Sequence, residues 1–139
     1  MKYSLQFSDA IHILAYLDIF AGSDRLASAD IAGSIETNPT RVRRIMAALK
    51  QAGLITTQAG SACPHLTKPT NQITFADVYA ALDEPQHIIP IDEKTNPDCP
   101  VGANIQAALD KQYQRLDAAL NAEMQQITLA EVLKDMPKV

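Results

Sequence analysis

Apolar residues recur at helical spacing between residues 39 and 51, and this segment predicts an amphipathic helix. Four residues at i, i+3, i+4 and i+7 make one apolar stripe that should face a core: Val42, Ile45, Met46 and Leu49. Asn38 is expected to cap this helix, and Pro39 suits the first helical position because its missing N–H costs nothing there. Gly53 is expected to end the helix in the left-handed conformation.

A shorter helix precedes it and begins at Ser28, which is expected to act as the N-cap. Ile31 and Ile35 are its buried positions, and Thr37 with Asn38 forms the break between the two helices. Two helices with this spacing have the form of a helix-turn-helix, whose second helix enters the major groove of DNA. An ordinary solvent-exposed basic helix is the alternative explanation of the same pattern.

The face of the second helix opposite the apolar stripe is basic. Arg44 points away from the stripe together with Thr40 and Ala47. Arg41 and Arg43 lie on the two flanks. This outward face therefore carries three arginines and no acidic residue.

The remaining apolar patterns predict one long helix and one hairpin in the first part of the chain. Residues 4–21 form a strongly apolar helix that should be buried in the core or against a partner subunit. Residues 54–58 and 65–68 predict two short strands joined by a turn, in the position of a winged-helix wing. Three side chains of this hairpin could contact DNA phosphates: Gln58, His65 and Lys68. A plain surface hairpin is the alternative.

The second half of the chain predicts two helix starts of one design, separated by a loop and a long helix. Thr74 and Thr128 are the expected caps, and we interpret the two starts as independent rather than duplicated. Residues 83–100 contain four prolines and predict a loop, and residues 101–126 predict the long helix. Its apolar seam is best explained by the same helix in a second subunit: Ile105, Leu109, Tyr113, Leu116, Leu120 and Met124.

Charge is distributed unevenly along the 139 residues. The formal net charge of −4 by itself argues against a nucleic-acid binder. Residues 38–72, however, contain five basic residues and no acidic one. A positive window inside an acidic chain is an electrostatic footprint for DNA, and this window coincides with the helix-turn-helix.

Composition excludes several other classes of protein. A hydrophobic content of 47% is enough for a core, and no apolar run reaches the length of a membrane span. The N-terminus does not resemble a signal peptide, and two cysteines do not make a disulfide framework, so we expect a cytoplasmic protein. An enzyme is not expected, because no nucleophile–base constellation or phosphate-binding glycine loop is present.

The order of these segments resembles the Rrf-two family of bacterial winged-helix transcription regulators, which includes IscR, NsrR and CymR. The resemblance covers nearly the whole chain and depends on the ordered set Asn-Pro-Thr-Arg-Val-Arg-Arg-Ile (38–45), Ala-Gly-Leu-Ile (52–55) and Leu-Thr-Lys-Pro (66–69). It implies a homodimer that binds an imperfect palindrome and usually represses. The wing departs from the family, whose members commonly have a Gly-rich wing that carries arginine.

Cluster-binding members of that family place three cysteines before the long helix, since thiolates hold iron–sulfur clusters. This chain has only Cys99 there, and counting back in steps of six residues gives Glu93 and His87. We therefore predict no iron–sulfur cluster and no metal. Cys99 and Cys63 are candidate redox sensors; a small ligand near the loop, or no signal at all, are the alternatives.

The sequence thus predicts a mainly α protein with a small β-hairpin, namely a winged helix-turn-helix followed by a long dimerisation helix. The expected segments are residues 1–82 for DNA binding, 83–100 as a sensor-type loop and 101–139 for dimerisation. The expected function is a homodimeric DNA-binding regulator that represses transcription; a dimeric protein-interaction adaptor without DNA binding is the alternative. The residues expected at double-stranded DNA are Ser28, Thr40, Arg41, Arg43, Arg44 and Lys68.

Overall fold

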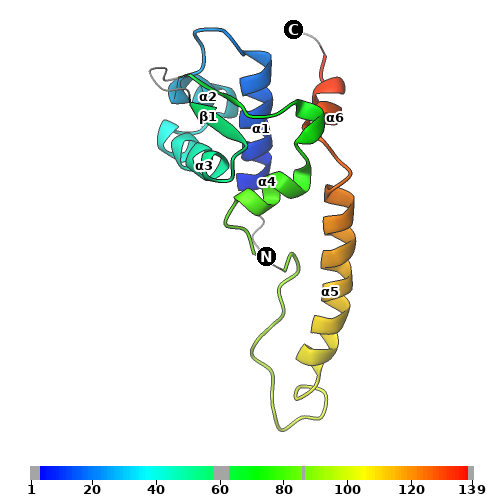
Figure 1. Ribbon diagram of the computed structural model, residues 1–139. Coiled ribbons are helices and arrows are strands. Elements are labelled where there is room, and N and C mark those ends of the chain that lie inside the picture. The colour runs from blue at the N-terminus through cyan, green and yellow to red at the C-terminus, as the bar shows by residue number, and fades with distance from the viewer. Residues whose placement is uncertain (1–3, 58–62, 86, 138–139) are drawn as a thin grey trace. The chain divides into compact units, whose positions relative to one another are not determined.

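The computed structural model describes residues 4–57, 63–85 and 87–137 and has the predicted fold class (Figure 1). In chain order the elements are α1 (Gln6–Ile19), α2 (Ser28–Ile35), α3 (Pro39–Gln51), β1 (Ile55–Thr57), β2 (Pro64–Leu66), the 3-10 helix η1 (Thr70–Gln72), α4 (Phe75–Ala81), α5 (Ile105–Met124) and α6 (Leu129–Lys134). The chain divides into two compact units. We call residues 1–84 with 125–139 the winged unit, and residues 85–124 the loop–helix unit.

The core of the winged unit is built around α1, which packs against α2, α3, α4, α6 and the hairpin. Ile13 and Leu14 of α1 are completely buried. They share one apolar cluster with buried residues of the other elements, including Ile31, Val42, Ile45, Leu49, Ile55, Ile73, Val78 and Leu129. Burial on most sides explains why the sequence of α1 is apolar almost all round.

The two ends of α3 are formed by the residues that the sequence predicts. The side-chain oxygen of Asn38 accepts a hydrogen bond of 2.8 Å from the backbone N–H of Arg41, and Pro39 is the first helical residue. At the other end Gly53 has a φ of +80°, the N–H of Leu54 donates to the carbonyl of Leu49, and the N–H of Gly53 donates to that of Lys50. This is a Schellman ending, which a left-handed glycine favours.

The start of α2 differs from the prediction. Ser28 is the first helical residue, and Ala27, with extended backbone, occupies the N-cap. The Asp30 carboxylate reaches back and accepts a hydrogen bond of 3.3 Å from the N–H of Ala27. The carboxylate at the third helical position thus satisfies the N–H of the N-cap residue, whereas the serine hydroxyl was expected to satisfy an N–H of the first turn.

The hairpin is antiparallel, with Ile55 opposite Leu66 and Thr57 opposite Pro64. At the end away from the turn the strands are shorter than predicted, because β1 begins at Ile55 and β2 ends at Leu66. The N–H of Leu54 donates to the ending of α3 and not to the hairpin. The N–H of Thr67 donates to the carbonyl of Leu54, and the hydroxyl of Thr67 donates to the carbonyl of Gly53. The turn of the hairpin and Gln58 lie outside the described residues.

The two similar helix starts are paired with each other. Thr74 and Thr128 form an antiparallel bridge, in which the N–H of Phe75 donates to the carbonyl of Ile127 and the N–H of Leu129 to that of Ile73, both at 2.9 Å. Each threonine hydroxyl also caps its own helix, as the sequence predicts. Together with the packing of α6 against α1 and η1, the bridge explains why α6 groups with the winged unit rather than with α5.

The loop–helix unit consists of an irregular segment fastened to α5. The Asp117 carboxylate on α5 contacts Nδ1 of His87 at 2.8 Å and accepts a hydrogen bond of 3.3 Å from the N–H of Ile88. The α-helix begins at Ile105 rather than at residue 101. Residues 99–104 form turns instead, and the side-chain amide of Asn104 donates to the carbonyl of Pro100. Asn104 thereby satisfies a carbonyl that an earlier helix start would have used.

The ending of α3 gives a stability test. Gly53→Ala should lower the free energy of unfolding by about 1–2 kcal/mol, because a side chain disfavours the left-handed backbone. Gly33→Ala is the matched control: it lies within α2 with open space around it, so it should raise stability by about 0.5–1 kcal/mol. Urea unfolding measures both, and equal effects of the two substitutions would contradict the assignment.

Candidate nucleic-acid interface

Helix α3 presents one face to the core and the opposite face to solvent. Val42, Ile45 and Leu49 are at most 1% exposed. Thr40, Arg43, Arg44 and Ala47 are exposed. Because burial of the apolar stripe determines how α3 is rotated about its axis, the outward direction of the basic face follows from packing. The predicted orientation of this helix is confirmed.

Arg41 does not share that outward position. Its guanidinium bonds to one oxygen of Asp9 on α1, at 2.7 Å from Nη2 and 3.2 Å from Nε. Both side chains are largely covered, with 29% of Arg41 and 19% of Asp9 exposed. A charge-assisted pair of this kind, joining α1 to α3, makes Arg41 a residue that positions the helix.

Two further bases of the positive window also have partners. Lys50 donates a hydrogen bond of 2.9 Å to the hydroxyl of Thr57, which joins α3 to β1. Lys68, expected at phosphate, lies 3.5 Å from the Asp77 carboxylate. The pKa of Asp77 is lowered chiefly by the hydrogen bond from the backbone N–H of Thr74, and the charge of Lys68 adds to this. The positive charge of Lys68 is therefore partly neutralised by the Asp77 carboxylate.

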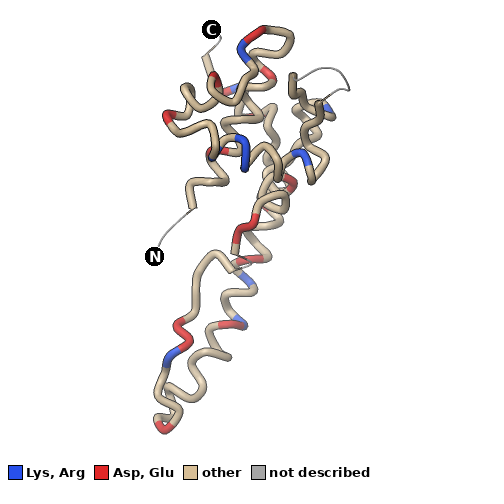
Figure 2. Tube along the Cα trace, turned by 90° about the vertical axis from the view of Figure 1, so that its left-hand side faces the viewer, with Lys and Arg blue, Asp and Glu red and all other residues tan. Residues whose placement is uncertain are grey.

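Three bases of this window form no ion pair among the described residues, namely Arg43, Arg44 and Lys50, and of these Lys50 is bonded to another element, β1. Arg43 donates a hydrogen bond of 3.3 Å to the hydroxyl of Thr40, so the two side chains lie together on the exposed face. Figure 2 shows where the basic and acidic positions lie along the trace. The structure thus narrows five candidate cations to two arginines beside one threonine.

The other predicted site residues lie apart from this face. Ser28 is half-buried at the start of α2, and His65 is half-buried in β2. Cys63 is exposed just before β2. No local signal in the sequence points to Asp9 as the partner of Arg41, because the two residues are 32 positions apart. The contact between Lys68 and Asp77 was likewise not predicted from the sequence.

Cys99 lies in the turns before α5 and is partly exposed. Hydrogen bonds from the backbone N–H groups of Gly102 and then Val101 lower the pKa of its thiol. A side chain at Gly102 would collide with the carbonyl oxygen of Asn96, so these turns are tightly packed. Within the described ranges, no three or more His, Cys, Asp or Glu residues are arranged to hold a metal ion, and no helix is both long and apolar enough to cross a membrane.

Comparison with known proteins agrees with the sequence resemblance. The Rrf2 family model, described as "Iron-dependent Transcriptional regulator", matches residues 3–135. The "Putative HTH-type transcriptional regulator YwnA" of Bacillus subtilis (strain 168) is 34% identical over 127 residues, which are 91% of this chain and 93% of that protein.

Solved structures support the same conclusion. A "putative DNA binding protein" is 34% identical, with a TM-score of 0.74 over 92% of this chain and 98% of that one. CymR, "the Global Cysteine Regulator of B. subtilis", has a TM-score of 0.70 over 99% of both chains; at 18% identity this is a likeness of fold. Members of this group are regulators and not enzymes. From the extent of the family match and the identity to its relatives, this chain belongs to the Rrf2 family of transcriptional regulators.

Proposed function

We propose that this protein is a homodimeric repressor that recognises an operator through α3. The observation that carries the proposal is the pair of exposed arginines, Arg43 and Arg44, beside Thr40 on the outward face of a buried helix. The guanidinium group of arginine can make a bidentate contact to the edge of guanine in the major groove, and a threonine hydroxyl can bind either a base or a phosphate. Arg41 holds α3 against α1, and Lys68 contributes charge near the backbone of the DNA.

Dimerisation is proposed from the exposed seam of α5. Leu116 is 51% exposed and Leu120 is 39% exposed, and both follow the helical spacing of the other seam residues. A helix of 20 residues is about 30 Å long, enough for an extended helix-to-helix contact. Burial of this seam in a second copy would also supply the two recognition helices that a palindromic operator needs, one helical turn apart.

We propose that the protein acts without an iron–sulfur cluster, although the family is described as iron-dependent. Clusters are held by several thiolates, and Cys99 is the one cysteine of the loop–helix unit. The residues present therefore do not fit a cluster. We further propose that Cys99 senses thiol oxidants in the cytoplasm, because its backbone donors favour the reactive thiolate.

Arg44→Ala should weaken binding to the promoter of the protein's own operon by about 1–3 kcal/mol, because a bidentate contact to a base edge is lost. Arg43→Ala should weaken binding comparably if it reads a base, or reduce the salt dependence if it binds phosphate. Lys134→Ala, an exposed base on α6, is the control and should bind as the wild type does. Absence of wild-type binding at about 50 mM salt, where phosphate contacts are strong, would overturn the proposal.

Leu116→Lys with Leu120→Lys should give monomers, because a buried interface cannot hold unpaired charges. Sedimentation velocity measures the oligomeric state. The matched control is Ala118→Lys with Ala122→Lys, which places two lysines at the same spacing on the opposite, exposed face of α5 and should leave the dimer intact. A dimer that survives the leucine substitutions would place the interface elsewhere.

Folding should lower the pH at which Cys99 becomes reactive. In Cys63→Ser protein, the midpoint of iodoacetamide alkylation against pH should lie lower for the folded chain than for the chain in urea, since the lowered pKa leaves more thiolate at a given pH. Mild peroxide should then change the DNA affinity of the wild type and leave Cys99→Ser unaffected. An equal response in both proteins would exclude Cys99 as the sensor.

A further inference from the structure

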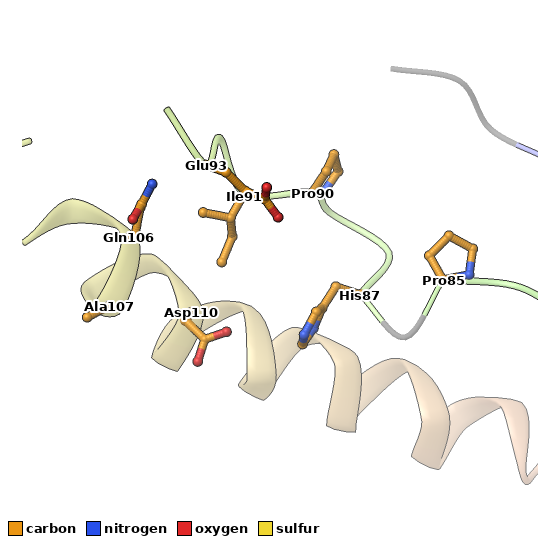
Figure 3. Close-up of a pocket in the computed structure, with 8 residues that line it drawn as sticks. All are labelled: Pro85, His87, Pro90, Ile91, Glu93, Gln106, Ala107 and Asp110. Carbon is orange, nitrogen blue, oxygen red and sulfur yellow. The ribbon is translucent and has the colours of Figure 1, made fainter. Parts of the chain in front are cut away.

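The loop–helix unit contains an open cavity of about 610 Å³ between its loop and the first turns of α5 (Figure 3). This volume is within the range of small-molecule sites. Pro90 and Ile91 from the loop, with Ala107 from α5, supply apolar surface. The cavity belongs entirely to residues 85–110, so it does not depend on how the two units are placed.

Four polar side chains line this cavity, and two of them, Glu93 and Asp110, are carboxylates; the others are His87 and Gln106, whose amide donates to the carbonyl of Asp92. Glu93 comes from the loop and Asp110 from α5, so each wall supplies a carboxylate. Glu93 forms no hydrogen bond or ion pair with any described residue. Asp110 accepts one hydrogen bond, 2.8 Å long from Gln114, on one of its two oxygens. Both carboxylates therefore keep free oxygen atoms for a ligand.

One base of the lining, His87, lies near these carboxylates; its pKa is raised chiefly by the hydrogen bond to Asp117 and also by the charge of Asp110. The lining includes no lysine or arginine. Its single base, His87, points to α5 and is bound by the Asp117 carboxylate at 2.8 Å, so any charge on the imidazole is already countered. The whole unit is acidic, with six acidic residues against three Lys or Arg. The excess of carboxylates therefore favours a ligand that brings positive charge.

Two observations distinguish an organic cation from a metal ion. Metal sites need several ligands converging at short distances, and among the described residues no group of three His, Cys, Asp or Glu does so. The apolar surface of Pro90, Ile91 and Ala107 would not contribute to the binding of a metal ion, whereas it would bury the hydrocarbon part of an organic ligand.

We propose that this cavity binds an organic ammonium ion with a compact apolar body, which Glu93 and Asp110 hold by charge-assisted hydrogen bonds. Binding would fasten the loop to α5, because the two carboxylates come from the two segments. As a regulatory ligand it would change DNA affinity, and that part of the inference rests on the proposed function; the binding itself does not.

In the test, the full-length protein is titrated with hexylammonium. Binding is measured by calorimetry and by changes in the amide NMR signals of residues 87–110. Saturable binding by hexylammonium is expected, with much weaker binding of hexanol and of hexanoate. This comparison uses the wild type alone, so it does not depend on any variant folding. No saturable binding, or equal binding of all three compounds, would overturn the proposal, as would tighter binding of Mn²⁺ that shifts the same signals.

Variants assign the two carboxylates. Glu93→Gln and Asp110→Asn should each weaken hexylammonium binding about tenfold, since each removes one charge-assisted contact. Glu123→Gln, which removes an exposed carboxylate of α5 outside the cavity, should bind as the wild type does. Unchanged binding in both lining variants would overturn the assignment.

A gel shift with the operon promoter separates this inference from the proposed function. Hexylammonium should change the DNA affinity of the wild type and leave the Glu93→Gln/Asp110→Asn protein unchanged. Ammonium binding without any DNA binding would refute the proposed function and support the cavity. Ammonium binding with an unaltered DNA affinity would overturn the regulatory part, and DNA binding without ammonium binding would overturn the cavity.

Discussion

Burial of the α3 stripe against α1 is the constraint on which the face that we propose for DNA binding depends. Val42, Ile45 and Leu49 share one core with Ile13 and Leu14 of α1. A helix that buries these three residues completely has no freedom to rotate about its axis, since any rotation would expose them. The directions of Arg43 and Arg44 therefore follow from hydrophobic packing on the other side of the helix.

Charge pairing within the fold then divides the positive window by role. Arg41, Lys50 and Lys68 each contact a partner on another element, whereas Arg43 and Arg44 remain on the exposed face. A positive window in the sequence measures the total charge and not the charge available to DNA. In this protein more than half of those bases contribute first to holding α3, the hairpin and α4 together.

Local signals predicted the parts of the fold that depend on local physics. The Asn38 cap, the Gly53 ending and the α3 stripe each follow from residues within one or two helical turns, and the structure has all three. The Asp9–Arg41 pair and the Thr74–Thr128 bridge join residues that are distant in sequence, so no period or motif could reveal them. The cap of α2 was mispredicted because two polar side chains near one helix start compete, and only the backbone geometry shows that Asp30 prevails over Ser28.

The bridge between Thr74 and Thr128 has a consequence for how such a protein can change over evolution. It fastens the two ends of the segment that contains the Pro-rich loop and α5, so this segment is an insertion into an otherwise closed winged unit. The entropy of closing a loop grows only with the logarithm of its length. Residues can therefore be gained, lost or exchanged inside the insertion at little cost to the winged unit. The chemistry of the loop is then free to diversify while the winged scaffold stays constant.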